Sequence, residues 1–313
     1  MLVAQVALDS GIMSASTVTS AQAIIATINE WAATSPEFVS SAVWADDLKS
    51  EANYLEANWH FIDLPVEDEA NPPPAPPPAP PAENVAWAVS EGSSTVRAAK
   101  STLLDKSRQL RFMVHFVGDV HQPLHAASYF SEQFPSGDAG GNAWPITSPI
   151  ASNLHSFWDS GAGQWSTDIS RPLSPASQAQ LKADAAALMT EHPASSFGTL
   201  VSAWPPMIWA NESVELAATV AYTAPQAPTA IPDAYVTEAV ALCRKQVALA
   251  GYRLATQIEY TLGQGQAAEP KVVAWAREAE AQLLAAARAR RESAPTSRQQ
   301  RQQHAHLRAG ATA

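Results

Sequence analysis

Residues 110–125 read Leu-Arg-Phe-Met-Val-His-Phe-Val-Gly-Asp-Val-His-Gln-Pro-Leu-His, and they decide the fold. Apolar residues at positions 110, 113, 114 and 117 recur at helical spacing, which predicts a helix. A second stripe beside the first holds Phe112, His115, Phe116 and Asp119. A helix with two such stripes is central to a bundle. Gly118 and Pro123 disturb or end it.

Two His/Asp pairs stand out in and after this stretch. His115 and Asp119 are four residues apart, and His155 and Asp159 repeat the spacing within Asn-Leu-His-Ser-Phe-Trp-Asp at 153–159. On a helix this spacing puts both side chains on one face. Two pairs on facing helices, with His125 folding back past the break, predict a metal site in a bundle core. The alternative is that each pair is only a structural hydrogen bond.

The remaining patterns are also helical. They predict two helices in 1–33 with a break near 14–20, then helices in 38–60, a pair in 84–118, and helices in 153–160, 176–192, 205–222 and 233–262. No alternating strand run of useful length appears, although the segment leading to Pro65 favours an extended backbone. The fold class is therefore all-α, a multi-helix bundle.

Two segments differ in composition from this helical body. Residues 71–82 are rich in proline and favour a polyproline II spacer inserted in the domain, with an SH3-type ligand as the alternative. Residues 266–313 form a tail in which we expect a helix from about 270 to 290 and then a basic, disordered end. A nucleic-acid tether is the alternative role for that tail. We expect one domain over 1–265.

Composition and charge narrow the class of function. The net charge of −11 excludes nucleic-acid binding by broad phosphate neutralisation, so local cations such as bound metal must attract a phosphodiester. The lone cysteine, Cys243, excludes a disulfide framework and a Cys-rich zinc site, and we expect it to be a core residue. The sequence contains no run of about 18 apolar residues, so it predicts no membrane span. The first residues do not form a signal peptide.

Several motifs together resemble the S1/P1 nuclease family, which is related to zinc-dependent phospholipase C. They occur in the family's order over roughly residues 1–265. The motifs are Trp44-Ala-Asp46, His60-Phe-Ile-Asp63, His115-Phe-Val-Gly-Asp119, Gln122-Pro-Leu-His125, Gly140-Gly-Asn142, Asn153-Leu-His-Ser-Phe-Trp-Asp159, Trp209-Ala-Asn-Glu-Ser213 and Gly251-Tyr-Arg-Leu-Ala255. The resemblance implies a bundle of the phospholipase C/P1 nuclease type.

The resemblance also implies a cluster of three Zn²⁺ ions. The first ion would be held by Asp46, His60, His115 and Asp119, and the second by His125, His155 and Asp159. Asp119 would bridge to a third ion, whose other ligands lie in a Trp-x-x-x-Gly-His start that this chain lacks. The residues present thus support two zinc ions. We expect that the chain begins at an internal methionine and that a signal peptide and the first ligands are missing.

The activity implied is that of an endonuclease and 3′-nucleotidase. A metal-bound hydroxide would hydrolyse single-stranded RNA and DNA, or nucleotides, to 5′-phosphorylated products. Asp46 could also hold the attacking water, and Lys49 would offset transition-state charge unless it is only a surface lysine. The family implies a secreted, cell-surface or endomembrane protein, in which the Asn211-Glu-Ser sequon becomes meaningful. We expect a monomer.

The predicted base pocket is formed by Phe61 and Asp63, with Gly140 and Asn142 as its opposite wall. Stacking on Phe61 requires an unpaired base, which explains a preference for single strands. A core role for Phe61 is the alternative, and we expect His121 to be either at the surface or behind the ligands. Two rival functions remain, a phospholipase C-like phosphodiesterase and a catalytically impaired zinc-binding protein.

Overall fold

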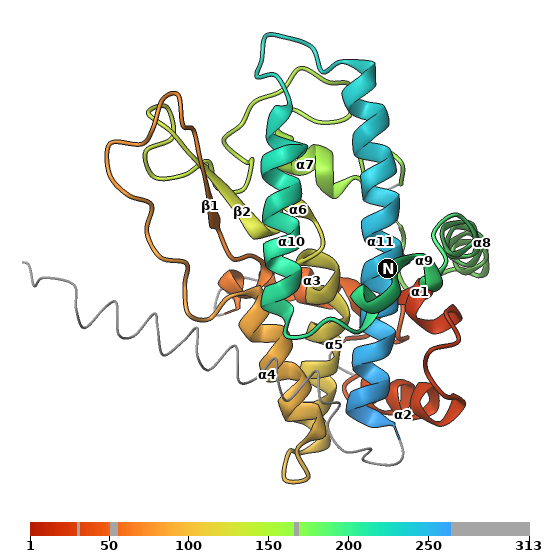
Figure 1. Ribbon diagram of the computed structural model, residues 1–313. Helices are drawn as coiled ribbons and strands as arrows, with labels where there is room; N and C mark the ends of the chain where they lie inside the picture. Colours follow the sequence, from red (N-terminus) through yellow and green to blue (C-terminus); the bar gives the residue numbers. More distant parts are fainter. Residues whose placement is uncertain (30–31, 51–55, 166–168, 264–313) are drawn as a thin grey trace, which may run out of the picture. The chain divides into compact units, whose positions relative to one another are not determined.

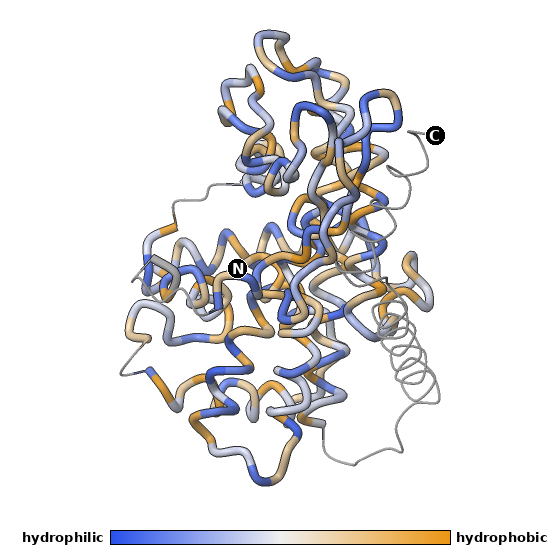
Figure 2. The backbone as a smooth tube through the Cα atoms, turned by 90° about the vertical axis from the view of Figure 1, so that its left-hand side faces the viewer, coloured by the Kyte–Doolittle hydropathy of each residue, from blue (hydrophilic) through white to orange (hydrophobic). Residues whose placement is uncertain are grey.

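The computed structural model describes residues 1–29, 32–50, 56–165 and 169–263, except for the side chains of residues 49 and 50. Helices make up most of this part of the chain (Figure 1), so the prediction of an all-α fold is confirmed. The tail predicted over 266–313 lies outside the described residues. Figure 2 shows hydrophobic and hydrophilic residues alternating along the helices, as expected when each helix buries one face.

Four long helices form the centre of the fold, and they are α4 (Val85–Arg97), α5 (Leu103–Asp119), α10 (Pro206–Thr219) and α11 (Asp233–Leu262). Helix α5 packs along α4, and α11 contacts both. The capping pair Thr102 and Asp105 starts α5, because each side chain accepts a hydrogen bond from the backbone N–H of the other. Every residue of α5 from Leu110 to Val117 is buried, as the two stripes predict.

An outer layer contains α1 (Leu2–Asp9), α2 (Ala15–Ala26), α8 (Pro175–Glu191) and α9 (Ala194–Phe197). Helix α1 contacts both α11 and α8, and Gly251 permits the close approach, because a Cβ there would lie 2.4 Å from Val6 Cγ1. The break between the first two helices falls at residues 10–14, earlier than predicted. The reason is that Ser14 caps α2 by accepting a hydrogen bond from the backbone of Thr17, so the Ser/Thr stretch starts the helix.

Short helices fill the connections and carry most of the predicted ligand residues. These are η1 (Ser40–Val43), α3 (Trp44–Ser50), η2 (Ala57–His60), α6 (Pro123–Ala126), α7 (Leu154–Asp159), η3 (Gly198–Ser202) and η4 (Ala221–Thr223). Pro123 stands in the first turn of α6 and Gln122 caps it, so the Gly/Pro break after α5 begins a new helix.

A two-stranded parallel sheet corrects the expectation that no useful strand exists. Strand β1 (Leu64–Glu67) pairs with β2 (Ala127–Phe130), with Leu64 opposite Ala127 and Glu67 opposite Phe130. Each strand has only four residues, too short for a visible alternation. The sheet matters because β1 follows His60 closely and β2 follows His125 directly, so their pairing brings the two ligand segments together.

The Pro-rich residues 71–82 form neither helix nor strand and are mostly exposed, in the connection between β1 and α4. Among the described residues, no helix combines the length and apolarity needed to cross a bilayer.

Candidate metal centre

The first group of ligand residues comes from α3, η2 and α5. Asp119 Oδ2 lies 3.0 Å from both His60 Nδ1 and His115 Nε2. Asp46 Oδ1 lies 3.7 Å from the same two nitrogens. The two nitrogens are themselves 3.1 Å apart. Two imidazoles and two carboxylates therefore converge on one point.

The second group comes from α6 and α7. Asp159 Oδ1 lies 3.3 Å from His125 Nε2, and Asp159 Oδ2 lies 3.4 Å from His155 Nε2. Potential ligand atoms of these three residues all lie within 4.8 Å of one another. The His155/Asp159 pair shares a helix face, as the spacing of four predicts.

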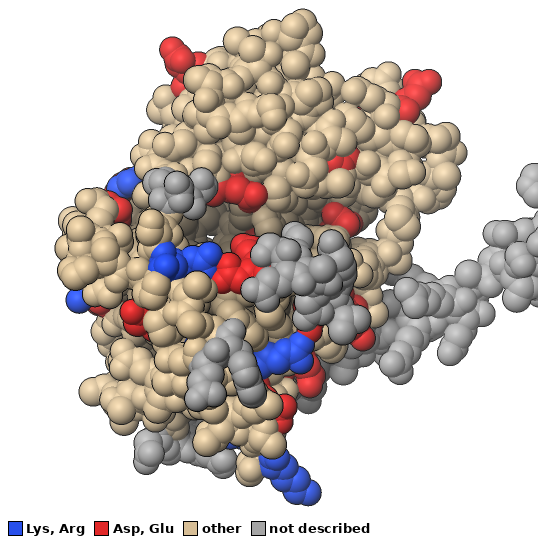
Figure 3. Space-filling model, turned by 180° about the vertical axis from the view of Figure 1, so that it is seen from behind, with Lys and Arg blue, Asp and Glu red and all other residues tan. Residues whose placement is uncertain are grey.

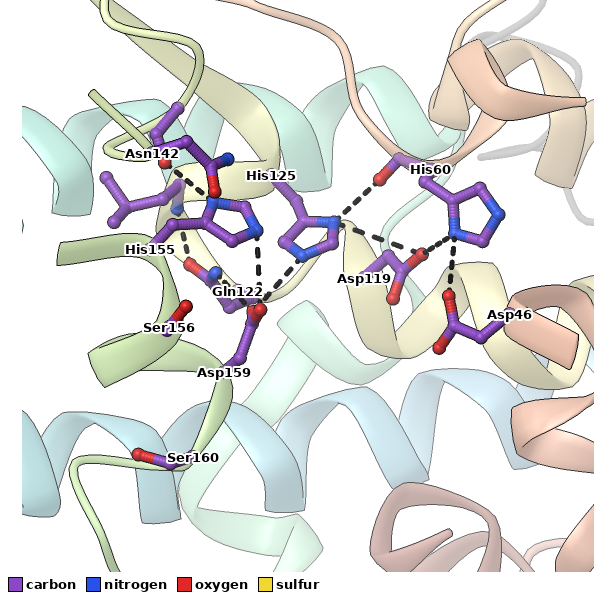
Figure 4. A network of polar contacts seen from close by, with 12 residues as sticks. Asp46, His60, Asp119, Gln122, His125, Asn142, His155, Ser156, Asp159 and Ser160 are labelled. Carbon is purple, nitrogen blue, oxygen red and sulfur yellow. Dashed lines mark hydrogen bonds and ion pairs between the residues drawn. The ribbon is translucent and has the colours of Figure 1, made fainter. Parts of the chain in front are cut away.

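The two groups are neighbours, and Figure 4 shows His125 between Asp119 and Asp159. Asp119 Oδ2 is 3.9 Å from His125 Nδ1, so one carboxylate reaches both groups. All seven residues predicted as metal ligands are thus brought together by five different helices. A pocket of about 250 Å³ adjoins them and is lined in part by Asp119, His125 and Asp159.

Backbone carbonyls orient three of the histidines. His115 Nδ1 donates to Ala42 O at 2.5 Å, His125 Nδ1 to His60 O at 2.7 Å, and His155 Nδ1 to Gly140 O at 2.6 Å. Each bond leaves Nε2 as the nitrogen that faces a carboxylate. This is the arrangement by which proteins fix the tautomer of metal-binding histidines. The donor set of imidazole nitrogen and carboxylate oxygen therefore fits a divalent cation in each group.

The charges of the cluster alter its pKa values. Burial alone would lower the pKa of His115 and of His125, but the charges of nearby carboxylates, Asp119 first among them, and hydrogen bonds together outweigh burial and raise the two pKa values to about 9 and about 10. Burial would raise the pKa of Asp119, yet the neighbouring imidazolium charges hold it well below its usual value. His115 and His125 therefore favour the protonated form near neutral pH when no metal is bound. Burial and then the charge of His125 lower the pKa of His155.

The residues of the predicted base pocket lie close to ligand residues, but none of them lines the pocket of about 250 Å³ beside the ligands. Phe61 and Asp63 follow His60 and are half-buried, whereas Asn142 is exposed and lies beside His155 (Figure 4). Asp63 has a φ of +49°, an uncommon conformation that asparagine and aspartate tolerate best. Burial, and then the charge of Asp138, raise the pKa of Asp63 to about 6.

Gly140, predicted as part of the opposite wall, supplies the carbonyl that accepts a hydrogen bond from His155. Its φ is +62°, and a Cβ would lie 2.5 Å from Leu124 O, so only glycine fits without displacement. Lys49 lies in α3, three residues after Asp46, and its side chain is outside the described part of the structure.

Two residues near the ligands were not foreseen from the sequence. Gln122 Nε2 donates to Asp159 Oδ1 at 2.9 Å, while Gln122 Oε1 caps α6. Its position just before Pro123 could have indicated the capping role. Asp138 is fully buried and accepts hydrogen bonds from Tyr129 N and Gly141 N, so it anchors the turn that carries Gly140. In the sequence, only the turn-forming composition of residues 137–142 could have indicated this role of Asp138.

A third unforeseen residue, Arg171, binds the helix that carries Asp46. Its guanidinium donates to both carboxylate oxygens of Asp47, at 2.5 and 2.8 Å, and to Ser35 Oγ at 3.0 Å. This bidentate ion pair fixes α3 through a residue 124 positions later in the sequence. No local sequence pattern predicts it.

His121 is buried, 2% exposed, and so does not lie at the surface. Its ring contacts Trp209 and Arg253, from α10 and α11. Cys243 is buried and also lines the pocket beside the ligands, where burial raises the pKa of its thiol to about 12.

Comparison with known proteins agrees with these features. Residues 1–263 match the family model of the S1/P1 nucleases. Nuclease P1 of Penicillium citrinum is 35% identical over 134 residues, which cover 38% of this chain and 43% of that protein. Endonuclease 5 of Arabidopsis thaliana is 31% identical over 178 residues, 52% of each chain. Nuclease S1 of Aspergillus oryzae is 29% identical over 143 residues, 42% of this chain and 45% of that protein.

In these matches the chain spans about half the length of the curated relatives. The family model, however, extends over every described helix, from α1 to α11. The chain belongs to the S1/P1 nuclease family.

Proposed function

We propose that this protein is a zinc-dependent nuclease and 3′-nucleotidase that hydrolyses single-stranded RNA and DNA to 5′-phosphorylated products. The observation that carries the proposal is the convergence of two His/Asp groups that share Asp119, with distances of 3.0 Å to the first group's histidines and 3.9 Å to His125. Two cations held in neighbouring groups would suit the attacking and leaving oxygens of a phosphodiester.

Zinc is the ion that the donor set favours. Imidazole nitrogen and carboxylate oxygen are common zinc ligands, and neither group contains cysteine. When bound, zinc would supply Lewis acidity, lowering the pKa of water and neutralising charge on the phosphate oxygens. The third ion implied by the family has no complete ligand set among the described residues, so the proposal rests on two.

The residues of the chain hold and orient the reactants. The Asp46 side chain is 58% exposed, so it can face the first group and still accept a hydrogen bond from the attacking water. Lys49, three residues after Asp46, is proposed to offset transition-state charge. His125, held by the His60 carbonyl, keeps the second group in register with the first.

Attraction of the phosphate depends on the metal centre rather than on the surface. On the one face of the molecule that Figure 3 shows, acidic and basic side chains are interspersed, without a continuous basic patch. The net charge of −11 would otherwise repel nucleic acid. Local positive charge in the pocket therefore accounts for binding.

Base recognition follows from the walls of the site. An unpaired base would stack on Phe61, with its polar edge at Asp63 and with Gly140 and Asn142 opposite. Stacking contributes roughly 1–3 kcal/mol per base and tolerates any sequence. A paired base cannot enter, so double strands are expected to react slowly. These polar groups favour nucleobases over the lipid substrate of a phospholipase C-like enzyme.

The proposal is tested with metal-free protein to which zinc is returned. We expect zinc to restore hydrolysis of a single-stranded oligonucleotide and of a 3′-nucleotide, with 5′-phosphate on the oligonucleotide products. The same oligonucleotide annealed to its complement should react more slowly, and phosphatidylcholine vesicles should not react. His60→Gln should abolish the activity, and His192→Gln, which changes a histidine outside both groups, should not.

Two results would contradict the proposal. Turnover of phosphatidylcholine without nuclease activity would make the protein a phospholipase. Zinc binding without turnover of any substrate would make it a catalytically impaired zinc-binding protein. We also propose a monomer that is secreted or held at the cell surface or endomembranes, which size-exclusion chromatography and cell fractionation can test.

A further inference from the structure

The turn between α5 and α6 carries one ligand residue of each group, because Asp119 ends α5 and His125 lies in α6. Two backbone carbonyls in this turn are held from other helices. Ser213 Oγ, from α10, donates to Val120 O at 2.6 Å, and Gln246 Nε2, from α11, donates to His121 O at 3.2 Å. The turn is thus braced by α10 and α11.

The His121 side chain joins the same brace. Its Nδ1–H donates to Val117 O at 2.7 Å, which leaves Nε2 as an acceptor. Arg253 Nη1 donates to that Nε2 at 2.9 Å. Both ring nitrogens are therefore occupied inside the protein, and neither is directed to a metal group.

Arg253 is itself fixed on three sides. Its Nη1 and Nη2 donate to the two carboxylate oxygens of Glu212 at 2.7 and 3.0 Å, and its Nε donates to Leu200 O at 2.9 Å. The side chain is 1% exposed, and its guanidinium lies over the Trp209 ring, 5.4 Å from the ring centre. Because all three nitrogens of the planar guanidinium are hydrogen-bonded, the group is held in one orientation. The single ammonium group of a lysine could not make the same set of bonds.

We propose that Arg253, acting through His121, is a positioning residue for the metal centre. The guanidinium fixes the ring of His121, and the ring fixes the turn that sets Asp119 relative to His125. A buried ion pair adds little to stability on average, because the cost of removing its charges from water offsets their attraction. The Arg253–Glu212 pair is better explained by the geometry that it imposes. The inference rests on the proposed binding of zinc by both groups.

The test is a double-mutant cycle with Arg253→Gln and His121→Phe. Zinc affinity is measured by competition with a chromophoric chelator, which needs no nuclease activity. We expect each variant to lower zinc affinity about 10- to 100-fold, as loss of a residue supporting a ligand does. Because both act in one chain of contacts, the double variant should lose no more than the worse single variant. Nitrogen-15 NMR of metal-free protein should show the Nδ1–H tautomer of His121, lost in Arg253→Gln.

The matched control is Arg244→Gln. Arg244 also lies in α11 and also pairs with a glutamate, Glu191, through two nitrogens. That pair is part-exposed and outside the metal groups, so its loss should leave zinc affinity unchanged. Should Arg253→Gln fail to fold, the same cycle of zinc affinities can be measured with His121→Phe and Glu212→Gln.

Independent, additive losses would mean that Arg253 does not act through His121, and would overturn the inference. Unchanged zinc affinity in folded Arg253→Gln would also overturn it while leaving the proposed function intact. Wild-type protein that binds no zinc would overturn the proposed function and this inference with it. Zinc binding without nucleic-acid hydrolysis would contradict only the proposed nuclease activity, and the affinity cycle would still support the positioning role.

Discussion

The Nδ1–H of His125 donates a 2.7 Å hydrogen bond to the main-chain carbonyl of His60, so a ligand residue of the second group is oriented by the backbone of the first. The sheet of β1 and β2 begins just beyond these two residues and holds their segments side by side. The two groups therefore form one structural unit. Damage to a shared member should affect both groups, whereas damage to a peripheral member should not.

Asp119→Asn should lower zinc affinity at the first group by more than about 100-fold, because loss of a mere supporting partner already costs 10- to 100-fold. Asp119 Oδ2 lies 3.0 Å from two histidine nitrogens of that group. Zinc per chain should fall from two to one or less in elemental analysis after dialysis. Asp159→Asn is the comparison and should spare the first group. Two zinc ions bound in Asp119→Asn would contradict the assignment.

Zinc binding should release about two protons per chain at pH 7.5, since imidazole must be neutral to bind metal. In metal-free protein the pKa values of His115 and His125 are raised to about 9 and about 10, because nearby carboxylates, Asp119 first among them, and hydrogen bonds together overcome the effect of burial. Calorimetry in buffers of different ionisation enthalpy measures the release. A titration heat independent of the buffer would contradict it.

The same shifts predict how stability depends on pH. Protonation of both histidines stabilises the metal-free fold fully below the unfolded pKa of about 6.5, and this contribution is lost as pH rises through about 9–10. Urea unfolding of metal-free protein should show the loss between pH 7 and 10. Zinc-loaded protein, whose imidazoles are neutral, should not show it.

Asp63→Asn should stabilise metal-free protein at pH 8 by at most about 2 kcal/mol after allowance for solvent screening. Burial, followed by the charge of Asp138, raises the pKa of Asp63 to about 6. The wild-type carboxyl is thus favourable when protonated, below about pH 4, and this advantage is lost as pH rises through 6. Asparagine also tolerates the φ of +49°, so the backbone stays unstrained. Equal stability of the two proteins at pH 8 would argue against the shift.

Gly140→Ala should weaken zinc binding at the second group, because a Cβ 2.5 Å from Leu124 O must displace the carbonyl that binds His155. The unfavourable φ of +62° adds a cost on the order of 1–3 kcal/mol. Gly11→Ala is the matched control, with a φ of +71° and no atom within 4 Å of the added Cβ. Both should lower stability in thermal unfolding, but only Gly140→Ala should lower zinc affinity.

Local periodicity was enough to predict the longer helices and the two His/Asp pairs. His115/Asp119 and His155/Asp159 each lie on one helix, so a spacing of four determines their common face. Asp46 and His60 have no such spacing to α5, and only the family resemblance placed them in the first group.

Long-range pairings left no local signal. Strands of four residues are too short to be recognised by alternation, and their parallel pairing joins residues 63 positions apart, as in Leu64 opposite Ala127. Glu212 and Arg253 are 41 residues apart, and nothing in either helix indicates the other. The same holds for Arg171 and Asp47. Burial of His121 therefore could not be predicted from its place two residues after Asp119.

The central claim is that two His/Asp groups bind metal side by side, and anomalous diffraction at the zinc absorption edge tests it most directly. The account predicts one anomalous peak about 2 Å from His60 Nδ1 and His115 Nε2, and a second about 2 Å from His125 Nε2 and His155 Nε2. Crystals of zinc-loaded protein with no anomalous peak at either pair of nitrogens would contradict it.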